Sequence, residues 1–261
     1  MKYVLVLVSV FLLSSCNFIM DKFSSKKEVV DNSVIIDSSS SDKKSLSGEV
    51  RYKFPSGKLK SIVNYKNNKK VGTSHSFYET GEKQYEIPYV DGQKHGLVKW
   101  FYKSGKLYRA TTYKEGLKHG LQNKYWENGK IKSEMLFENN MMCTGLKEFT
   151  IKGKQKQEPK IIVRYEDLLD QSNMYHLNLS MEKRYRKVQF YIGELKHGKC
   201  FPLKPNTVLS ELETKKGKAT FKFSIPKGRT IDKDIPIIAV VQSSYQNYYI
   251  ISTTERVNIE N

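Results

Sequence analysis

Residues 92–120 read GQKHGLVKWFYKSGKLYRATTYKEGLKHG, and the motif at the start returns almost unchanged at the end. Gly92-Gln93-Lys94-His95-Gly96 comes back 24 positions later as Gly116-Leu117-Lys118-His119-Gly120. Working outward, a leading glycine stands every 24 residues, at Gly48, Gly72, Gly96 and Gly120. A spacing of this length that repeats without gaps is typical of an array of small structural units.

Three further positions keep the same phase in every unit. A second glycine comes nine residues after the leading one, at Gly57, Gly81, Gly105 and Gly129. Three residues before it stands an aromatic residue, and eight residues after it stands another, at Tyr65, Tyr89, Tyr113 and Phe137. The units therefore run 48–71, 72–95, 96–119 and from 120 onward, and a degenerate fifth unit begins at Gly145 and fades near Pro159.

Each unit is predicted to be a β-hairpin. The second glycine follows Ser, Thr or Asn, and glycine at a hairpin tip supplies a positive φ without a Cβ clash. After the tip, apolar residues such as Leu59, Val63 and Tyr65 recur two or four positions apart, which places them on one face of a strand. One hairpin cannot bury its aromatic face alone, so neighbouring units are expected to extend one sheet and share a wall of rings. The prediction is an all-β chain containing an elongated hairpin array.

The pattern of glycines, aromatic residues and Lys-His-Gly junctions, clearest from Gly96 to Gly120, resembles the MORN-repeat variant. The resemblance covers about 100 residues and concerns architecture. It implies a module for protein–protein contacts and, in some cases, for contact with membrane lipids. Similar proteins are often labelled as antitoxin components of toxin–antitoxin systems, so the resemblance also implies an antitoxin or immunity-type role as an alternative.

The remaining segment, residues 161–261, is predicted to be a separate small antiparallel β-sandwich of immunoglobulin-like type. Met174–Met181 alternates between apolar and polar residues, and Ile235–Val241 is almost continuously apolar, as a central strand should be. We expect five to seven short strands here, divided by turns that contain glycine.

The first residues carry an export signal. A charged start, a short apolar core and small residues before Cys16 form a secretory signal peptide over residues 1–15. Leu13-Ser14-Ser15-Cys16 resembles the bacterial lipobox, which implies acylation of Cys16, palmitate included, and a membrane anchor. Residues 16–47 are rich in Ser, Lys and Asp and are expected to form a flexible linker. The predicted location is the bacterial cell envelope, on the periplasmic side or facing the surface.

The two other cysteines, Cys143 and Cys200, fall in different predicted domains. Export favours disulfides, but the sequence places no constraint on the distance between these residues. Whether they pair stays open at this point.

The net charge of +18 is concentrated on the repeats, because residues 48–160 hold 23 basic and 11 acidic residues. Export argues against nucleic acid as the partner. The lysines either keep the sheet soluble and protect its edges, or form a surface for anionic lipid, polysaccharide or an acidic protein.

The sequence offers no motif for catalysis or for a cofactor. His95 and His119 are equivalent in the repeat, but no Cys, Asp or Glu recurs beside them to complete a metal site. His75, His176 and His197 stand alone, and two acidic pairs, Asp167 with Asp170 and Asp232 with Asp234, are expected to serve in caps and turns. We therefore expect no enzyme, no metal and no cofactor, but a membrane-anchored scaffold that binds another envelope or secreted protein.

Overall fold

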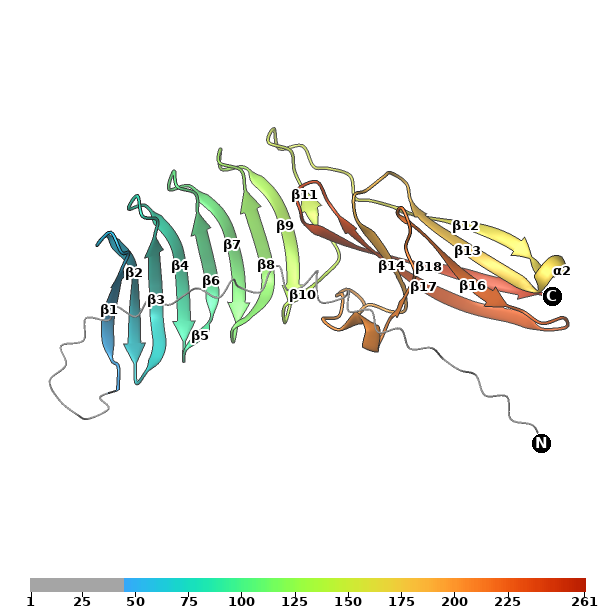
Figure 1. Ribbon diagram of the computed structural model, residues 1–261, viewed down its shortest axis with the longest axis horizontal. Helices are drawn as coiled ribbons and strands as arrows, with labels where there is room; N and C mark the ends of the chain where they lie inside the picture. Colours follow the sequence, from blue (N-terminus) through green and yellow to red (C-terminus); the bar gives the residue numbers. More distant parts are fainter. Residues whose placement is uncertain (1–44) are drawn as a thin grey trace. The chain divides into compact units, whose positions relative to one another are not determined.

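The computed structural model describes residues 45–261, which belong to one compact unit. These residues form antiparallel sheets with two very short helical turns, so the predicted all-β class is confirmed (Figure 1). The predicted signal peptide, Cys16 and most of the linker lie outside the described residues. From residue 45 onward, no helix has the length and hydropathy needed to cross a bilayer.

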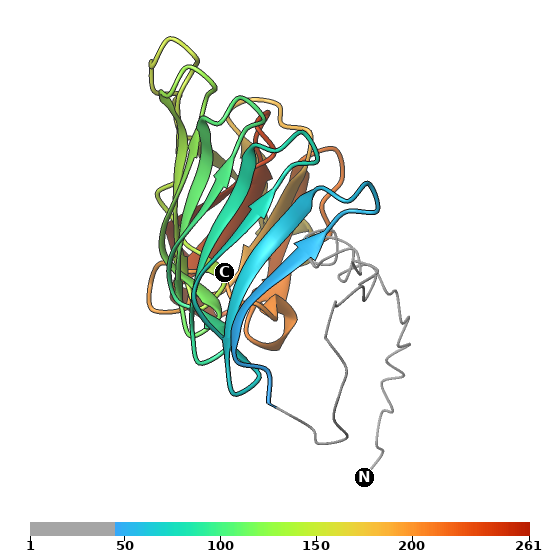
Figure 2. The ribbon, with the colours of Figure 1, turned by 90° about the vertical axis from the view of Figure 1, so that its left-hand side faces the viewer.

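The repeats form one sheet of 11 strands, and the predicted array of hairpins is confirmed (Figure 1). Consecutive strands are neighbours along the whole series, and seen along the series they fan out in the usual β-sheet twist (Figure 2). The strands are β1 (Gly48–Lys53), β2 (Leu59–Lys66), β3 (Lys69–Phe77), β4 (Lys83–Val90), β5 (Gln93–Lys94), β6 (Gly96–Phe101), β7 (Leu107–Lys114), β8 (Leu117–Tyr125), β9 (Ile131–Glu138), β10 (Met141–Met142) and β11 (Lys147–Glu148).

Every hairpin tip has the same geometry. The Gly57 N–H donates to the Phe54 carbonyl at 2.9 Å, and Gly57 has a φ of 80° that favours glycine. A register shift at the same place in each hairpin inserts one extra residue, so Leu59 does not continue the alternation of Val63 and Tyr65. The same pattern recurs at a fifth tip, where the Gly153 N–H donates to the Thr150 carbonyl at 2.8 Å. Gly153 lies 24 residues after Gly129, so the period continues one tip further than the sequence analysis assigned it.

Successive hairpins are joined at both edges of the sheet. At the tip edge, the Tyr78 and Tyr102 hydroxyls donate to the backbone carbonyls of Phe101 and Tyr125, at 2.7 and 2.8 Å. At the other edge, turn residues donate to a lysine carbonyl of the preceding repeat at 2.9 Å, in the pairs Gly92 to Lys70, Gly116 to Lys94 and Asn140 to Lys118. Each repeat is thus held by its neighbours, as repeat units too small to fold alone require.

The C-terminal residues form two packed antiparallel sheets. As in immunoglobulin-like sandwiches, the first, second and fifth strands make one sheet, and the sixth and seventh pair in the other beside the third and fourth. Leu177, Phe190 and Ile237, contributed by both sheets, are completely buried between them. The elements are β12 (Ile161–Leu168), α2 (Leu169–Ser172), β13 (Met174–Met181), β14 (Val188–Ile192), η1 (Pro205–Thr207), β15 (Ser210–Glu211), β16 (Lys218–Ser224), β17 (Thr230–Gln242) and β18 (Tyr248–Glu260).

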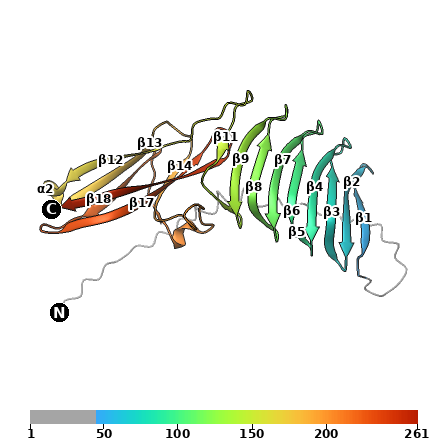
Figure 3. The same cartoon turned by 180° about the vertical axis from the view of Figure 1, so that it is seen from behind.

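The end of the repeat sheet shares its core with the sandwich. Met135 and Phe137 of β9 and Leu146 are buried in the same cluster as the apolar residues of the two sandwich sheets. Alongside, the tip of the β17–β18 hairpin lies against the last repeat near β11 (Figures 1 and 3). The last repeat is therefore covered by protein, whereas the repeats before it are single-layered.

Glu148 is the polar centre of this contact. Its carboxylate is fully buried and accepts hydrogen bonds from Ser243 Oγ at 2.6 Å and Asn247 Nδ2 at 2.7 Å. Lys156 Nζ lies 3.2 Å from the same carboxylate and also lies 4.1 Å from the centroid of the Tyr245 ring. A buried carboxylate is tolerated only when it is paired in this way, so Glu148 fixes where the hairpin tip docks.

The cysteine pairing that the sequence left open is formed in the structure. Cys143, just after β10, and Cys200, in the loop after β14, are fully buried and joined by a disulfide across 57 residues. Their backbones also form a short antiparallel bridge. The disulfide therefore links the last repeat to the sandwich covalently.

Removing the disulfide should destabilise the protein. Closing a loop of this length contributes about 4 kcal/mol in the loop-entropy description, and measured losses are typically about 2–5 kcal/mol. We expect Cys143→Ser combined with Cys200→Ser to lower the free energy of unfolding by such an amount in urea titrations. Ser104→Ala at an exposed tip is the control, and equal stabilities of the double variant and the control would contradict this assignment.

Candidate binding surface

Lysines and aromatic rings alternate in one row across the repeat sheet. Cross-strand pairing places Tyr65 opposite Lys70, Tyr89 opposite Lys94 and Tyr113 opposite Lys118, and paired residues share a face. Each lysine then reaches forward to the ring of the next repeat. We call this set the lysine–aromatic row, and the side of the sheet that carries it the ladder face: Tyr65, Lys70, Tyr89, Lys94, Tyr113, Lys118 and Phe137.

The forward contacts are cation–π interactions. Lys70 Nζ lies 5.3 Å from the Tyr89 ring centroid, and Lys94 Nζ lies 5.5 Å from that of Tyr113. Lys118 Nζ lies 4.9 Å from the Phe137 ring. A contact of this kind contributes about 0.5–1 kcal/mol when exposed and more when desolvated, so the row also ties each repeat to the next.

The residues that define the repeat in the sequence all take part in this geometry. The leading glycines lie directly opposite the rings, in the pairs Gly48 with Tyr65, Gly72 with Tyr89, Gly96 with Tyr113 and Gly120 with Phe137. A lysine two residues before each later glycine can extend over the ring because glycine has no side chain to obstruct it. The second glycines, Gly57, Gly81, Gly105 and Gly129, lie at the tips, away from the row.

A second line of large side chains runs nearer the tips on the ladder face. Trp100 stacks on Tyr85 with ring centroids 5.4 Å apart, and the Arg109 guanidinium lies 4.9 Å from the Trp100 ring centroid. Arg109 is paired across the strands with Lys124, whose Nζ donates to Asn247 Oδ1 of the sandwich at 2.6 Å. The ladder face therefore carries cations in two parallel lines.

Short polar side chains lie between the two lines in the third and fourth repeats. Thr111 and Gln122 are buried and directly paired, and Thr111 Oγ1 donates to Gln122 Oε1 at 3.1 Å. At the equivalent places nearer the N-terminal end the residues are Val63, Ile87 and Val98. The surface between the cations thus changes from apolar to polar toward the sandwich.

The cations of the ladder face have no acidic partners. Among residues 45–261, no carboxylate lies within ion-pair distance of Lys70, Lys94, Arg109, Lys118 or Lys124. On the opposite face, by contrast, Glu86 lies 2.7 Å from Lys83 and 3.2 Å from Lys99. Only the ladder face gathers positive charge without neutralising it.

Burial and mutual repulsion weaken proton binding by these lysines. Burial lowers the pKa of Lys94, and the nearby Lys70 and Arg109 charges lower it further. Burial and the charges of Arg109 and Lys94 do the same for the pKa of Lys118. At Lys124, burial with Arg109 and Lys132 lowers the pKa to about 8. All three shifts express a positive site that lacks counter-charge.

The histidines hold local contacts instead of forming a cluster. His119 Nδ1 lies 3.2 Å from Asn139 Oδ1 in the neighbouring turn, and the His95 N–H donates to the Pro88 carbonyl at 3.0 Å. His176 Nδ1 lies 3.3 Å from Glu166 Oε2. His75 lies on β3, where its Nδ1 is buried without a hydrogen-bond partner in the described part of the chain.

One group of potential metal ligands does come together, around the disulfide. Glu138, Cys143 and Cys200 offer atoms within 4.8 Å of one another. The two sulfur atoms are bonded to each other and so are not thiolate ligands. Glu138 instead accepts from His197 Nδ1 at 2.6 Å, and this contact, with Lys199 nearby, lowers the pKa of the Glu138 carboxyl.

The acidic pairs act as the sequence analysis expected of caps and turns. Asp167 Oδ1 accepts the Leu169 N–H at 3.0 Å, at the start of α2, and Asp170 lies within that helical turn. Asp232 and Asp234 face one guanidinium, that of Arg256, at 2.6 and 3.1 Å.

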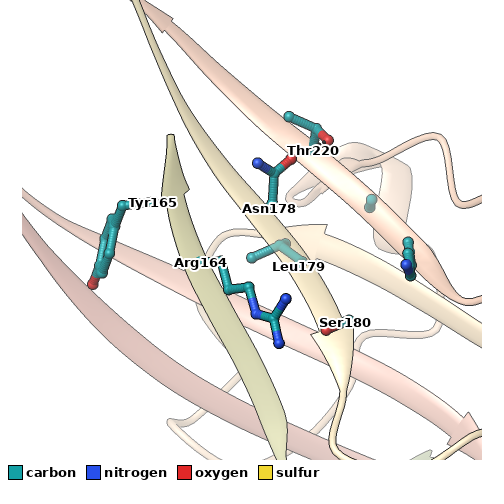
Figure 4. A pocket seen from close by; sticks show the side chains of 8 residues that line it. Arg164, Tyr165, Asn178, Leu179, Ser180 and Thr220 are labelled. Carbon is teal, nitrogen blue, oxygen red and sulfur yellow. Dashed lines mark hydrogen bonds between the residues drawn. The ribbon is translucent and has the colours of Figure 1, made fainter. Parts of the chain in front are cut away.

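The sandwich has a hollow of about 420 Å³ on its three-stranded sheet (Figure 4). Arg164, Asn178 and Thr220 line it in one cross-strand row. Thr220 Oγ1 donates to Asn178 Oδ1 at 2.8 Å, and Asn178 Nδ2 donates to Glu166 Oε2 at 3.0 Å. Because these groups already bond one another, the hollow presents few polar atoms to a ligand.

Comparison with known families concerns the repeat sheet. Residues 46–67, 70–91, 94–115 and 118–139 match the family model described as MORN repeat variant. The chain carries four tandem MORN-variant repeats. Each match ends at the turn before the next repeat, in phase with the hairpins of the structure. No curated protein matches the chain.

MORN repeats are commonly modules that bind proteins or membranes. In this chain the matched residues contain the whole lysine–aromatic row, from Tyr65 to Phe137. The sequence analysis identified the rings but missed the lysines between them. The signal was present, because Lys70, Lys94 and Lys118 are 24 residues apart and each follows a ring by five positions.

The low pKa of Lys124 can be measured by competitive acylation with mass-spectrometric readout. We expect its labelling to rise with a midpoint near pH 8, against about 10.4 for a lysine peptide added as standard. Since the folded-state pKa lies below the unfolded value, the charged form costs stability at pH 7, and this cost falls as the pH rises from about 8 toward 10.4.

Two variants test the cause of that shift. Arg109→Gln should raise the Lys124 midpoint, because a neighbouring positive charge is removed, whereas Lys99→Gln on the opposite face should leave it unchanged. A Lys124 midpoint equal to that of the peptide standard would contradict the description of the ladder face.

Proposed function

We propose that this protein is a non-enzymatic adaptor of the bacterial cell envelope, anchored through acylated Cys16, which binds a partner protein through the ladder face. The observation that carries the proposal is the set of half-buried cations on that face without any carboxylate partner. Charge left uncompensated on a surface disfavours the free protein and favours a complex with an acidic partner.

The architecture supports binding over catalysis. Over β1 to β8 the repeats form a single layer, which offers a broad face and no enclosed space of the kind that holds a small substrate. The acidic pairs considered for acid–base chemistry hold a helix start and an arginine instead. Both observations favour an adaptor that acts on macromolecules.

The lipobox at Leu13–Cys16 supports location in the envelope. The buried Cys143–Cys200 disulfide adds independent support, since such bonds persist in the oxidising compartments that exported proteins enter.

Photo-crosslinking in intact cells tests the binding face. Benzoylphenylalanine in place of Tyr89 or Tyr113 should yield discrete protein adducts under ultraviolet light. The same residue in place of Leu97 or Leu121, which lie on the opposite face and are 45% and 53% exposed, is the matched control. Adducts that form only from the control positions, or from none of the four, would refute binding through the ladder face.

Anchoring is tested separately with a clickable palmitate analogue and membrane fractionation. Cys16→Ala should abolish acyl labelling and move the protein out of the membrane pellet, because several acyl chains are needed for stable anchoring. Asn17→Ala should retain both properties. Labelling that survives in Cys16→Ala would rule out this residue as the anchor.

A further inference from the structure

The lysines of the ladder face form a regular series. Lys70, Lys94 and Lys118 occupy the same register position on β3, β5 and β8, one repeat apart. Each repeat adds two strands, and neighbouring strands lie about 4.8 Å apart, so successive lysines are spaced by about 9.6 Å. A ligand that contacts all three must present negative charges at this interval.

The cations are densest at the third and fourth repeats. There the Arg109–Lys124 pair runs parallel to Lys94 and Lys118, and polar Thr111 and Gln122 lie between the two lines. Carboxylates laid along the lysines would therefore meet further donors on one side. The depressed pKa values of Lys94, Lys118 and Lys124 agree with a site that gains from added negative charge.

The rings of the row leave little surface for stacking a sugar. Each ring has a lysine as its neighbour on both sides within the row, and one of these places its Nζ over the ring of Tyr89, Tyr113 or Phe137. An acidic polysaccharide would lose its stacking contacts here. A peptide chain, whose carboxylates stand on flexible side chains, needs only the ammonium groups.

The spacing also selects the conformation of such a peptide. In a polyproline II helix every third residue points to the same side, with three residues per turn and a rise of 3.1 Å, which gives about 9.3 Å. In a β-strand, same-side residues are spaced by about 6.8 Å and fall out of step with the lysines.

We propose that the ladder face binds an acidic polyproline II segment of the partner protein, laid across the strands with carboxylates at every third residue. This inference rests on the adaptor function proposed above and names the chemistry of its partner. Lys70, Lys94 and Lys118 take successive carboxylates, and Arg109 and Lys124 flank the segment at the sandwich end.

Fluorescence anisotropy with the full-length chain in detergent micelles tests the spacing. The probe is a fluorescein-labelled peptide of four Glu-Pro-Pro units, and the control peptide has the same composition with its four glutamates in one block. We expect the spaced peptide to bind at least about tenfold more tightly, which corresponds to loss of roughly one charge contact in the control. Equal affinities would overturn the inference about conformation.

Matched variants test the surface. Lys94→Gln combined with Lys118→Gln should weaken binding of the spaced peptide at least about tenfold, and Lys94→Arg combined with Lys118→Arg should retain it, because the charge is kept. Lys66→Gln combined with Lys114→Gln removes the same charge from exposed residues outside the row and should change affinity less than about twofold. An equal loss in both Gln pairs would show a general charge effect and refute the site.

Polygalacturonate serves as the competing ligand. If it binds more tightly than the spaced peptide, and Lys94→Gln with Lys118→Gln abolishes that binding, the ligand is an acidic polysaccharide and the peptide inference is wrong. If neither ligand binds while the crosslinks from Tyr89 persist, the adaptor function stands and its partner has a different chemistry.

Discussion

The structure depends on contacts between successive hairpins of the repeat sheet. A two-stranded hairpin is marginal in water because it cannot cover its own apolar face. Here each hairpin places a lysine over the ring of the next one, donates a tyrosine hydroxyl at the tip edge and a turn N–H at the other edge. Since the same contacts recur with every 24 residues, stability accumulates along the array instead of residing in a central core.

An array of this kind must end without leaving an open apolar face. The lysine of the row is replaced at the equivalent position of the fourth repeat by Met142, which packs against the sandwich core. Phe137, the last ring of the row, is buried there as well. Glu148 and the disulfide then hold the sandwich in place. The sandwich therefore serves as the cap of the repeats, whatever else it binds.

The same arrangement separates stability from function on the two faces. Opposite the row, acidic residues such as Glu86 neutralise their lysine neighbours. On the ladder face the lysines are held over rings, which stabilise a cation without neutralising its charge. The array thus keeps its positive charge partly buried and available, which is an unusual condition for a surface that binds nothing.

Much of this architecture could be read from the sequence because it arises from local, repeated chemistry. The glycines at the tips and the rings of the row recur at fixed intervals, and the alternating strands of the sandwich obey the period of two, so hairpins, array and sandwich followed from the sequence. The sequence also carried the lysine spacing, although its meaning becomes visible only when cross-strand pairing places each lysine beside a ring.

Contacts between distant residues were decided by the tertiary structure alone. The pairing of Cys143 with Cys200 and the docking of Asn247 on Glu148 join segments that no local pattern connects. The absence of counter-charge on the ladder face is also a tertiary fact, because composition counts acidic residues without saying which face they occupy. Local periodicity determines which strands form, whereas the position of one sheet against another depends on side chains that meet only after the strands have formed.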